Sequence, residues 1–237
     1  MKKEADGIEE NWKTKRRFME ATFDRLGERV RLIPELEERN FPDEALLLCC
    51  CHIEALGNAF WSKEDKQGKF GRNFVRVLEE YGGQVSLALI HPDRLIQALS
   101  NSQENRKLAE LIKHHLSKPT NSLYSEYEFL ELAKEFLTPE QLENLRNLLW
   151  RGTIANIVYD RLRGSQVHAA WGPQVATFDR TTNNGKQGIF VSVHTLYRAL
   201  LSIIQKAQEI SLDSGTWCGH AEKGRRVALR KQSNPGP

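Results

Sequence analysis

The stretch YDRLRGSQVHAA, at residues 159–170, brings two arginines and a histidine together directly before the pair Gly172-Pro173. Arginine is a permanent cation that can hold phosphate oxygens through two parallel hydrogen bonds, and histidine exchanges a proton near neutral pH. Such a pair suits chemistry on a phosphodiester, where one side chain stabilises charge and the other moves a proton. Cleavage of RNA needs no metal for this, because the ribose 2′-hydroxyl is a nucleophile already held beside the phosphate.

The spacing within this stretch limits how its side chains can meet. On an unbroken helix Arg161 and His168 share one face, about 10 Å apart along the axis, and Ser165 lies between them on that face. Arg163 and His168 differ by roughly 140° and point apart, unless Gly164 lets the helix distort or end. By spacing alone the pattern is weak evidence, since a surface arginine paired with a neighbouring aspartate and a hydrogen-bonded histidine would look the same.

Helical periodicity predicts the elements that must position this stretch. The segment 12–36 is expected to form a helix that buries apolar residues at helical spacing: Phe18, Phe23, Leu26, Val30 and Ile33. Phe41-Pro42-Asp43-Glu44 predicts the start of a central helix that is apolar almost all round. Further helices are expected at 70–81, at one or both of 91–99 and 104–115, and at 122–136.

A second group of signals predicts the helix that leads into the motif and the elements after it. Thr138 and Gln141 form the pattern of a capping box, and the helix that they open is expected to bend at Gly152 and to end inside the motif. After Pro173, two short β-branched or aromatic runs flank Asn184-Gly185, which predicts a hairpin. A last helix over 194–210 is expected to bury its apolar face: Leu196, Leu200, Ile203, Ile204 and Ala207.

The fold class expected from these signals is mostly α, a helical bundle with one small β-hairpin before the last helix. Residues 1–212 are expected to form a single domain, and residues 213–237 a basic and flexible C-terminal tail.

The composition is that of an ordinary globular chain. The 237 residues are 40% apolar and 27% charged, with a formal net charge of +3, which allows a nucleic-acid partner without arguing for one. No apolar run approaches the roughly 18 residues of a membrane span, and the N-terminus lacks the apolar segment of a secretory signal. We expect a cytoplasmic protein with no membrane partner. The adjacent Cys49, Cys50 and Cys51 are expected to be reduced core residues.

The motif and its helical context resemble the HEPN superfamily. The order tyrosine, leucine-arginine, then valine-histidine-alanine in YDRLRGSQVHAA is similar to the Arg-x4–6-His signature of that superfamily. The early helix LLLCCCHIEALGNAF and the segment FGRNFVRVLEEY are similar to earlier helices of HEPN-like proteins. The resemblance covers roughly residues 41–210. It implies a metal-independent endoribonuclease without a cofactor, acting in a toxin–antitoxin or antiviral-defence setting.

The resemblance also implies roles for particular residues. Arg163 and His168 are the signature pair, Arg161 is the alternative arginine, and Glu54 holds the acidic position of the early helix. Two protomers would bring their motifs together across a homodimer interface. The implied partners are RNA, a second copy of the chain, and an antitoxin or other defence protein.

Ser165 and Trp171 are candidate substrate-binding residues. Ser165 lies on the motif face, and Trp171 either stacks on a base or closes the bundle.

Three alternatives remain open. The residue after the signature arginine is usually polar in the family and is Gly164 here, which favours a catalytically inactive dimer that binds RNA or a partner protein. An α-helical interaction protein without affinity for RNA is the plainest reading. Cys49, His52, Cys218 and His220 have the residue types of a zinc site, but we expect no metal, because a buried helix uses small sulfur side chains in the same way.

Overall fold

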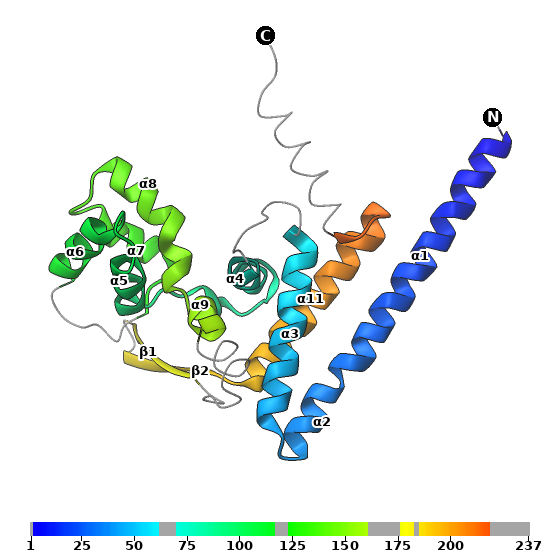
Figure 1. Ribbon diagram of the computed structural model, residues 1–237, viewed down its shortest axis with the longest axis horizontal. Coiled ribbons are helices and arrows are strands. Elements are labelled where there is room, and N and C mark those ends of the chain that lie inside the picture. Colours follow the sequence, from blue (N-terminus) through cyan, green and yellow to red (C-terminus); the bar gives the residue numbers. More distant parts are fainter. Residues whose placement is uncertain (1, 62–69, 117–122, 161–175, 183–184, 219–237) are drawn as a thin grey trace, which may run out of the picture.

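The computed structural model describes residues 2–61, 70–116, 123–160, 176–182 and 185–218, and these are mostly helical. Figure 1 shows two groups of helices, with α1, α2, α3 and α11 on one side and α5 to α8 on the other. Among the described residues, no helix is both long and apolar enough to cross a membrane.

The N-terminal part is a helical hairpin whose two arms are α1 (Lys2–Val30) and α3 (Pro42–Trp61), with the short α2 (Leu32–Glu38) between them. The predicted single helix over 12–36 is therefore divided after Val30. The chain reverses at Asn40, whose φ of 68° is one that asparagine tolerates better than most residues.

One predicted core residue of α1 is wrong. Phe18 is 74% exposed, whereas its neighbour Met19 is 6% exposed. Residues that share one face of a helix are three or four positions apart, as are 19, 23, 26, 30 and 33. Phe18 is five positions before Phe23, so it lies off that buried face. Of the other predicted positions, Phe23, Val30 and Ile33 are buried, and Leu26 is partly buried against the same core.

The central helix α3 starts at Pro42, as predicted, and packs against α2, α4 (Phe70–Tyr81) and α11 (Val193–Ser214). Cys49 and Cys50 are fully buried and all three adjacent cysteines are free, but Cys51 is exposed, so the prediction of three core cysteines is wrong for Cys51. Three successive helical residues span about 200°, more than α3 can bury at this position.

The last helix, α11, begins with a capping box in which Ser192 and Thr195 hydrogen-bond each other's backbone N–H. All five apolar residues predicted for its inner face are buried. Beyond α11, Trp217 stacks on Phe23 with ring centroids 5.3 Å apart, and Cys218 is buried. The chain thus continues to pack on the core past residue 212, and the basic residues predicted for the tail lie outside the described residues.

The helices α5 (Pro92–Ser100), α6 (Arg106–His115), α7 (Glu126–Ala133) and α8 (Pro139–Leu148) surround a second, smaller apolar cluster. The two clusters meet where the chain leaves the 3-10 turn η1 (Val85–Ala88). Ile90 exchanges backbone hydrogen bonds with Tyr124 at 2.7 and 3.0 Å, and the Ile154 N–H donates to the Leu89 carbonyl at 2.9 Å. These backbone bonds tie the α5–α8 group to α9 (Ile154–Val158).

The helix opened by Thr138 has the predicted capping box and is interrupted where the sequence placed a bend. After α8 comes the 3-10 turn η2 (Leu149–Gly152), and Thr153 then caps α9. Gly152 lies so close to α5 that a Cβ there would come within 2.6 Å of the Leu95 Cβ. The absence of a side chain at Gly152 therefore permits the close packing that fixes η2 and the start of α9.

Two strands precede α11. The strands β1 (Ala176–Thr182) and β2 (Gly185–Val191) pair antiparallel, with Ala176 opposite Val191 and Thr182 opposite Gly185. Asn184 of the predicted turn lies outside the described residues, so the hairpin as a complete unit stays a prediction.

Candidate functional site

Most residues predicted to act on substrate lie outside the described residues. These are Arg161, Arg163, Ser165, His168 and Trp171, so the structure tests neither their positions nor their roles. Glu54 is the exception: it lies on α3 and is partly buried. The structure nevertheless describes the chain up to Asp160 and the residues that surround Asp160.

Tyr159, the first residue of the stretch YDRLRGSQVHAA, packs against the larger apolar cluster, which α3, α4 and α11 share. The Tyr159 ring contacts the Phe74 ring, with centroids 5.2 Å apart, and a Cβ on Gly71 would lie 2.7 Å from the Tyr159 ring. Tyr159 and Asp160 have π-helical hydrogen bonding, a local widening that is frequent at functional sites. Close contact between α4 and α9 thus fixes where the motif begins.

Asp160 opens onto a polar pocket of about 240 Å³ between α5 and the η2–α9 segment, which we call the arginine pocket. Its polar lining comes from α5 and the residue after it, from η2, and from α9 and the turn after it: Arg94, Gln97, Asn101, Arg151, Asn156 and Asp160.

Hydrogen bonds position the walls of the arginine pocket. The Arg94 guanidinium donates to the Gln97 side-chain oxygen at 2.9 Å. The Asn156 amide donates to the Arg151 carbonyl at 2.9 Å and to the Asp160 carboxylate at 3.5 Å. Asn156 therefore links η2, which carries Arg151, to Asp160.

The electrostatics of the arginine pocket favour an anion. The Arg151 guanidinium lies 5.6 Å from the centre of the Trp150 ring, and its buried Nε has no hydrogen-bond partner within the described part of the chain. Burial raises the pKa of Asp160, and the nearby Arg94 opposes that rise. Two permanent cations, Arg94 and Arg151, thus share the pocket with one carboxyl group.

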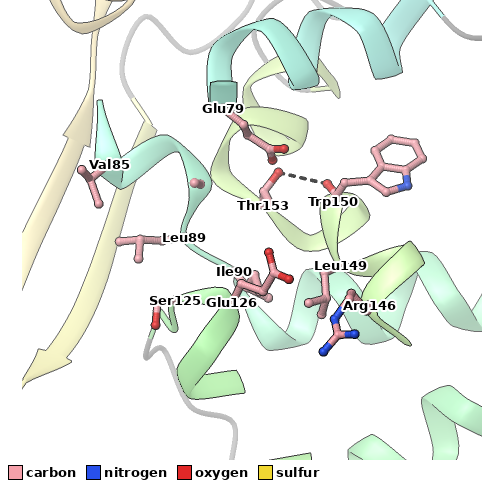
Figure 2. Close-up of a pocket in the computed structure, with 11 residues that line it drawn as sticks. Glu79, Val85, Leu89, Ile90, Ser125, Glu126, Arg146, Leu149, Trp150 and Thr153 are labelled. Carbon is pink, nitrogen blue, oxygen red and sulfur yellow. Dashed lines mark hydrogen bonds between the residues drawn. The ribbon is translucent and has the colours of Figure 1, made fainter. Parts of the chain in front are cut away.

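A second pocket, of about 330 Å³, is lined by Leu149 and Trp150 of η2. We call it the glutamate pocket. In Figure 2 Glu79 and Thr153 lie at one end of it and Arg146 at the other, with Glu126 between them. Leu89, Ile90, Leu149 and other apolar residues complete its walls.

Glu79 is the group in the glutamate pocket that is suited to proton exchange. Burial raises the pKa of Glu79 to about 7, and repulsion from Glu80 and Glu126 adds to the rise. Its buried Oε1 has no hydrogen-bond partner among the described residues. A carboxylic acid with this pKa can gain or lose a proton near neutral pH.

No group of three or more histidine, cysteine, aspartate or glutamate side chains is placed to hold a metal ion among the residues that the structure describes. Cys49 is buried on α3, and burial together with the neighbouring Cys50 raises the pKa of its thiol. Burial and the charge of Arg29 lower the pKa of His52. His220, the fourth residue considered for zinc, lies outside the described residues.

Reasoning from the sequence missed Glu79, Arg94 and Arg151. Glu79 directly follows the buried Leu78 at the margin of the inner face of α4, and this position was the signal that could have identified it. No comparable signal exists for Arg94 and Arg151, because only the packing of α5 against η2 brings them to one pocket.

Comparison with models of protein families, with curated proteins and with solved structures returns no match to this chain. The class of protein is therefore inferred from the motif and from the surroundings described above.

Proposed function

We propose that this chain is a metal-independent endoribonuclease of HEPN type. The observation that carries the proposal is the Arg163–His168 signature in YDRLRGSQVHAA, in a mostly helical chain. The polar pocket at Asp160, three residues before Arg163, supports it because binding of RNA requires cations and hydrogen-bond donors for its phosphates.

In the proposed reaction the ribose 2′-oxygen attacks the adjacent phosphorus, and the bond from phosphorus to the 5′-oxygen breaks. The 2′-hydroxyl loses its proton and the departing 5′-oxygen gains one, which leaves a 2′,3′-cyclic phosphate and a 5′-hydroxyl. His168 exchanges these protons, while Arg163, with Arg161 as the alternative, stabilises the charge on the phosphate oxygens. Glu54 orients the arginine or the histidine, and Ser165 and Trp171 contact the substrate.

The proposal includes a homodimer, in which motifs from two protomers form one composite site. It also includes a cytoplasmic setting and a partner that restrains or directs the activity, such as an antitoxin or another defence protein. In the proposed architecture β1 and β2 belong to one hairpin that follows the motif and precedes α11.

A catalytically inactive dimer that binds RNA or a partner protein is the second candidate. Gly164 favours it, because a glycine after the signature arginine supplies no side chain to hold the arginine or contact the substrate. The arginine pocket serves this candidate as well, since binding an anion does not require His168.

A cleavage assay tests the proposal. Wild type, His168→Ala and the control His194→Ala would be incubated with labelled total RNA in EDTA, and the dimer would be checked by light scattering. His194 is an exposed histidine on α11 with no assigned role, so its replacement controls for the loss of any imidazole. We expect cleavage by wild type and His194→Ala, with cyclic-phosphate ends, and none by His168→Ala.

Two other outcomes would change the proposal. Cleavage that disappears in EDTA would argue against a metal-independent mechanism. RNA binding without cleavage by any of the three proteins would favour the inactive dimer.

A further inference from the structure

We infer that the arginine pocket is a phosphate-binding subsite, which holds the RNA backbone next to the signature motif. This inference rests on the proposed function for the identity of the ligand as RNA. The pocket itself is formed entirely by described residues and does not depend on the position of the motif.

The balance of hydrogen-bonding groups supports an anionic ligand rich in acceptors. Arg94 and Arg151 have only donors, and Gln97 accepts from Arg94 through its oxygen, which leaves its amide nitrogen as a donor. Phosphate oxygens would complement this excess of donors, and guanidinium groups bind them with favourable geometry.

The cations of the pocket are held in place before a ligand binds. Arg151 lies against the Trp150 ring, and its backbone carbonyl accepts from Asn156. Arg94 projects from α5, which the close approach of Gly152 to Leu95 fixes against η2. Side chains that are already positioned lose less conformational entropy on binding, so each contact contributes more to affinity.

A substitution at Asp160 should change the affinity for phosphate in the opposite direction from a substitution at either arginine. Its carboxylate would repel a phosphate in the same pocket, and burial already disfavours its charged form. Replacing Asp160 with asparagine should therefore strengthen phosphate binding, whereas replacing either arginine should weaken it. A pocket with a purely structural role would give no such pair of opposite effects on binding.

The location of the pocket determines which phosphate it would hold. Asp160 lines the pocket and directly precedes Arg161 in the chain. A phosphate bound by Arg94 and Arg151 would therefore lie beside the residue that precedes Arg161. We expect these arginines to act on binding, seen as KM, more than on kcat.

The test uses a labelled 2′-O-methyl RNA oligonucleotide of mixed sequence, which cannot supply the attacking hydroxyl and so stays intact. Its dissociation constant would be measured by fluorescence anisotropy over a range of salt concentrations. The proteins are full-length wild type, Arg94→Gln, Arg151→Gln, Asp160→Asn and the control Arg16→Gln. Arg16 lies on α1, on the other side of the molecule from α5 in Figure 1, and pairs with Glu20 at 3.0 Å.

We expect Arg94→Gln and Arg151→Gln to weaken binding roughly tenfold each, because a hydrogen bond to a charged group is lost. Each should also reduce the salt dependence by about 0.7 in the slope of log K against log salt, the value for one phosphate contact on a single strand. Asp160→Asn should strengthen binding up to about fivefold. Arg16→Gln should bind as wild type does, and circular dichroism would verify that each variant is folded.

The outcomes separate this inference from the proposed ribonuclease. If both pocket variants bind like Arg16→Gln, the subsite is wrong even when wild type cleaves RNA. If binding depends on the pocket but wild type never cleaves, the subsite holds and the ribonuclease proposal fails. If wild type neither binds nor cleaves RNA, both are overturned. Should a glutamine variant misfold, Arg94→Lys and Arg151→Lys would replace it, with a smaller expected loss of affinity because the charge remains.

Discussion

The Glu79 carboxyl group faces the hydroxyl group of Thr153, which already donates its proton to the Trp150 carbonyl at 3.0 Å (Figure 2). A hydroxyl group has one proton, so Thr153 cannot donate to Glu79 at the same time. A protonated Glu79 can instead donate to the Thr153 oxygen. This geometry favours the protonated carboxyl group, in agreement with the raised pKa of Glu79, which is about 7.

The first prediction follows from this pKa, which is about 7 in the folded chain against an ordinary value of 4.5. The folded state binds the proton more tightly than the unfolded state, so the free energy of unfolding falls as the pH rises from about 4.5 to 7. Glu79→Gln should remove this dependence and stabilise the protein at pH 8 by up to about 3 kcal/mol, with little change at pH 4. Urea denaturation at both values measures the difference.

The control for that prediction is Glu80→Gln, at the exposed neighbouring position on α4. Because repulsion from Glu80 is only a minor cause of the raised pKa of Glu79, this variant should keep most of the pH dependence that Glu79→Gln removes. A pH dependence that persists in Glu79→Gln would show that another group is responsible for it.

A second prediction concerns the close approach of η2 to α5. In Gly152→Ala the new methyl group would lie 2.6 Å from the Leu95 Cβ and 3.1 Å from its Cα, and neither atom can move without its backbone. We expect a loss of about 1–3 kcal/mol in the free energy of unfolding. We also expect weaker RNA binding, since η2 carries Arg151.

The matched control is Gly27→Ala on α1, where a Cβ would meet nothing within 4 Å. Alanine is the better helix former, so this variant should gain up to about 1 kcal/mol. Equal effects of the two substitutions on thermal unfolding would contradict the proposed close contact at Gly152.

A third prediction tests the rotational position of α1 through two adjacent residues. Met19 is 6% exposed and Phe18 is 74% exposed. Met19→Ala should destabilise the protein by about 2 kcal/mol through lost burial and an unfilled space, while Phe18→Ala should change stability by less than about 0.5 kcal/mol. The reverse order in chemical denaturation would mean that α1 packs through its other face.

Local signals were enough to identify most of the helices. Proline and acidic residues at Pro42-Asp43-Glu44 predicted the start of α3, and the capping box at Thr138 and Gln141 predicted the start of α8. The apolar face of α11 was also predicted correctly. These predictions hold because caps and helical periodicity act within a few residues of the chain.

The arrangement of those helices needed the tertiary structure. The exposure of Cys51 and Phe18 depends on how much of a helix its neighbours cover, which periodicity alone does not determine. The separation into two apolar clusters was not predicted either, because the backbone bonds of Ile90 with Tyr124 join segments far apart in the chain.

The sequence by itself determined the residue types and order of the signature, with Arg163 and His168 at a spacing that resembles the HEPN pattern. Only the tertiary structure decided which groups meet at Asp160, the last described residue before the signature. Arg94 comes from α5 and Arg151 from η2, and the contact of Gly152 with Leu95 brings both to the pocket at Asp160. Likewise, the raised pKa of Glu79 arises from its burial, and burial is a property of the packed chain rather than of the segment that contains the residue.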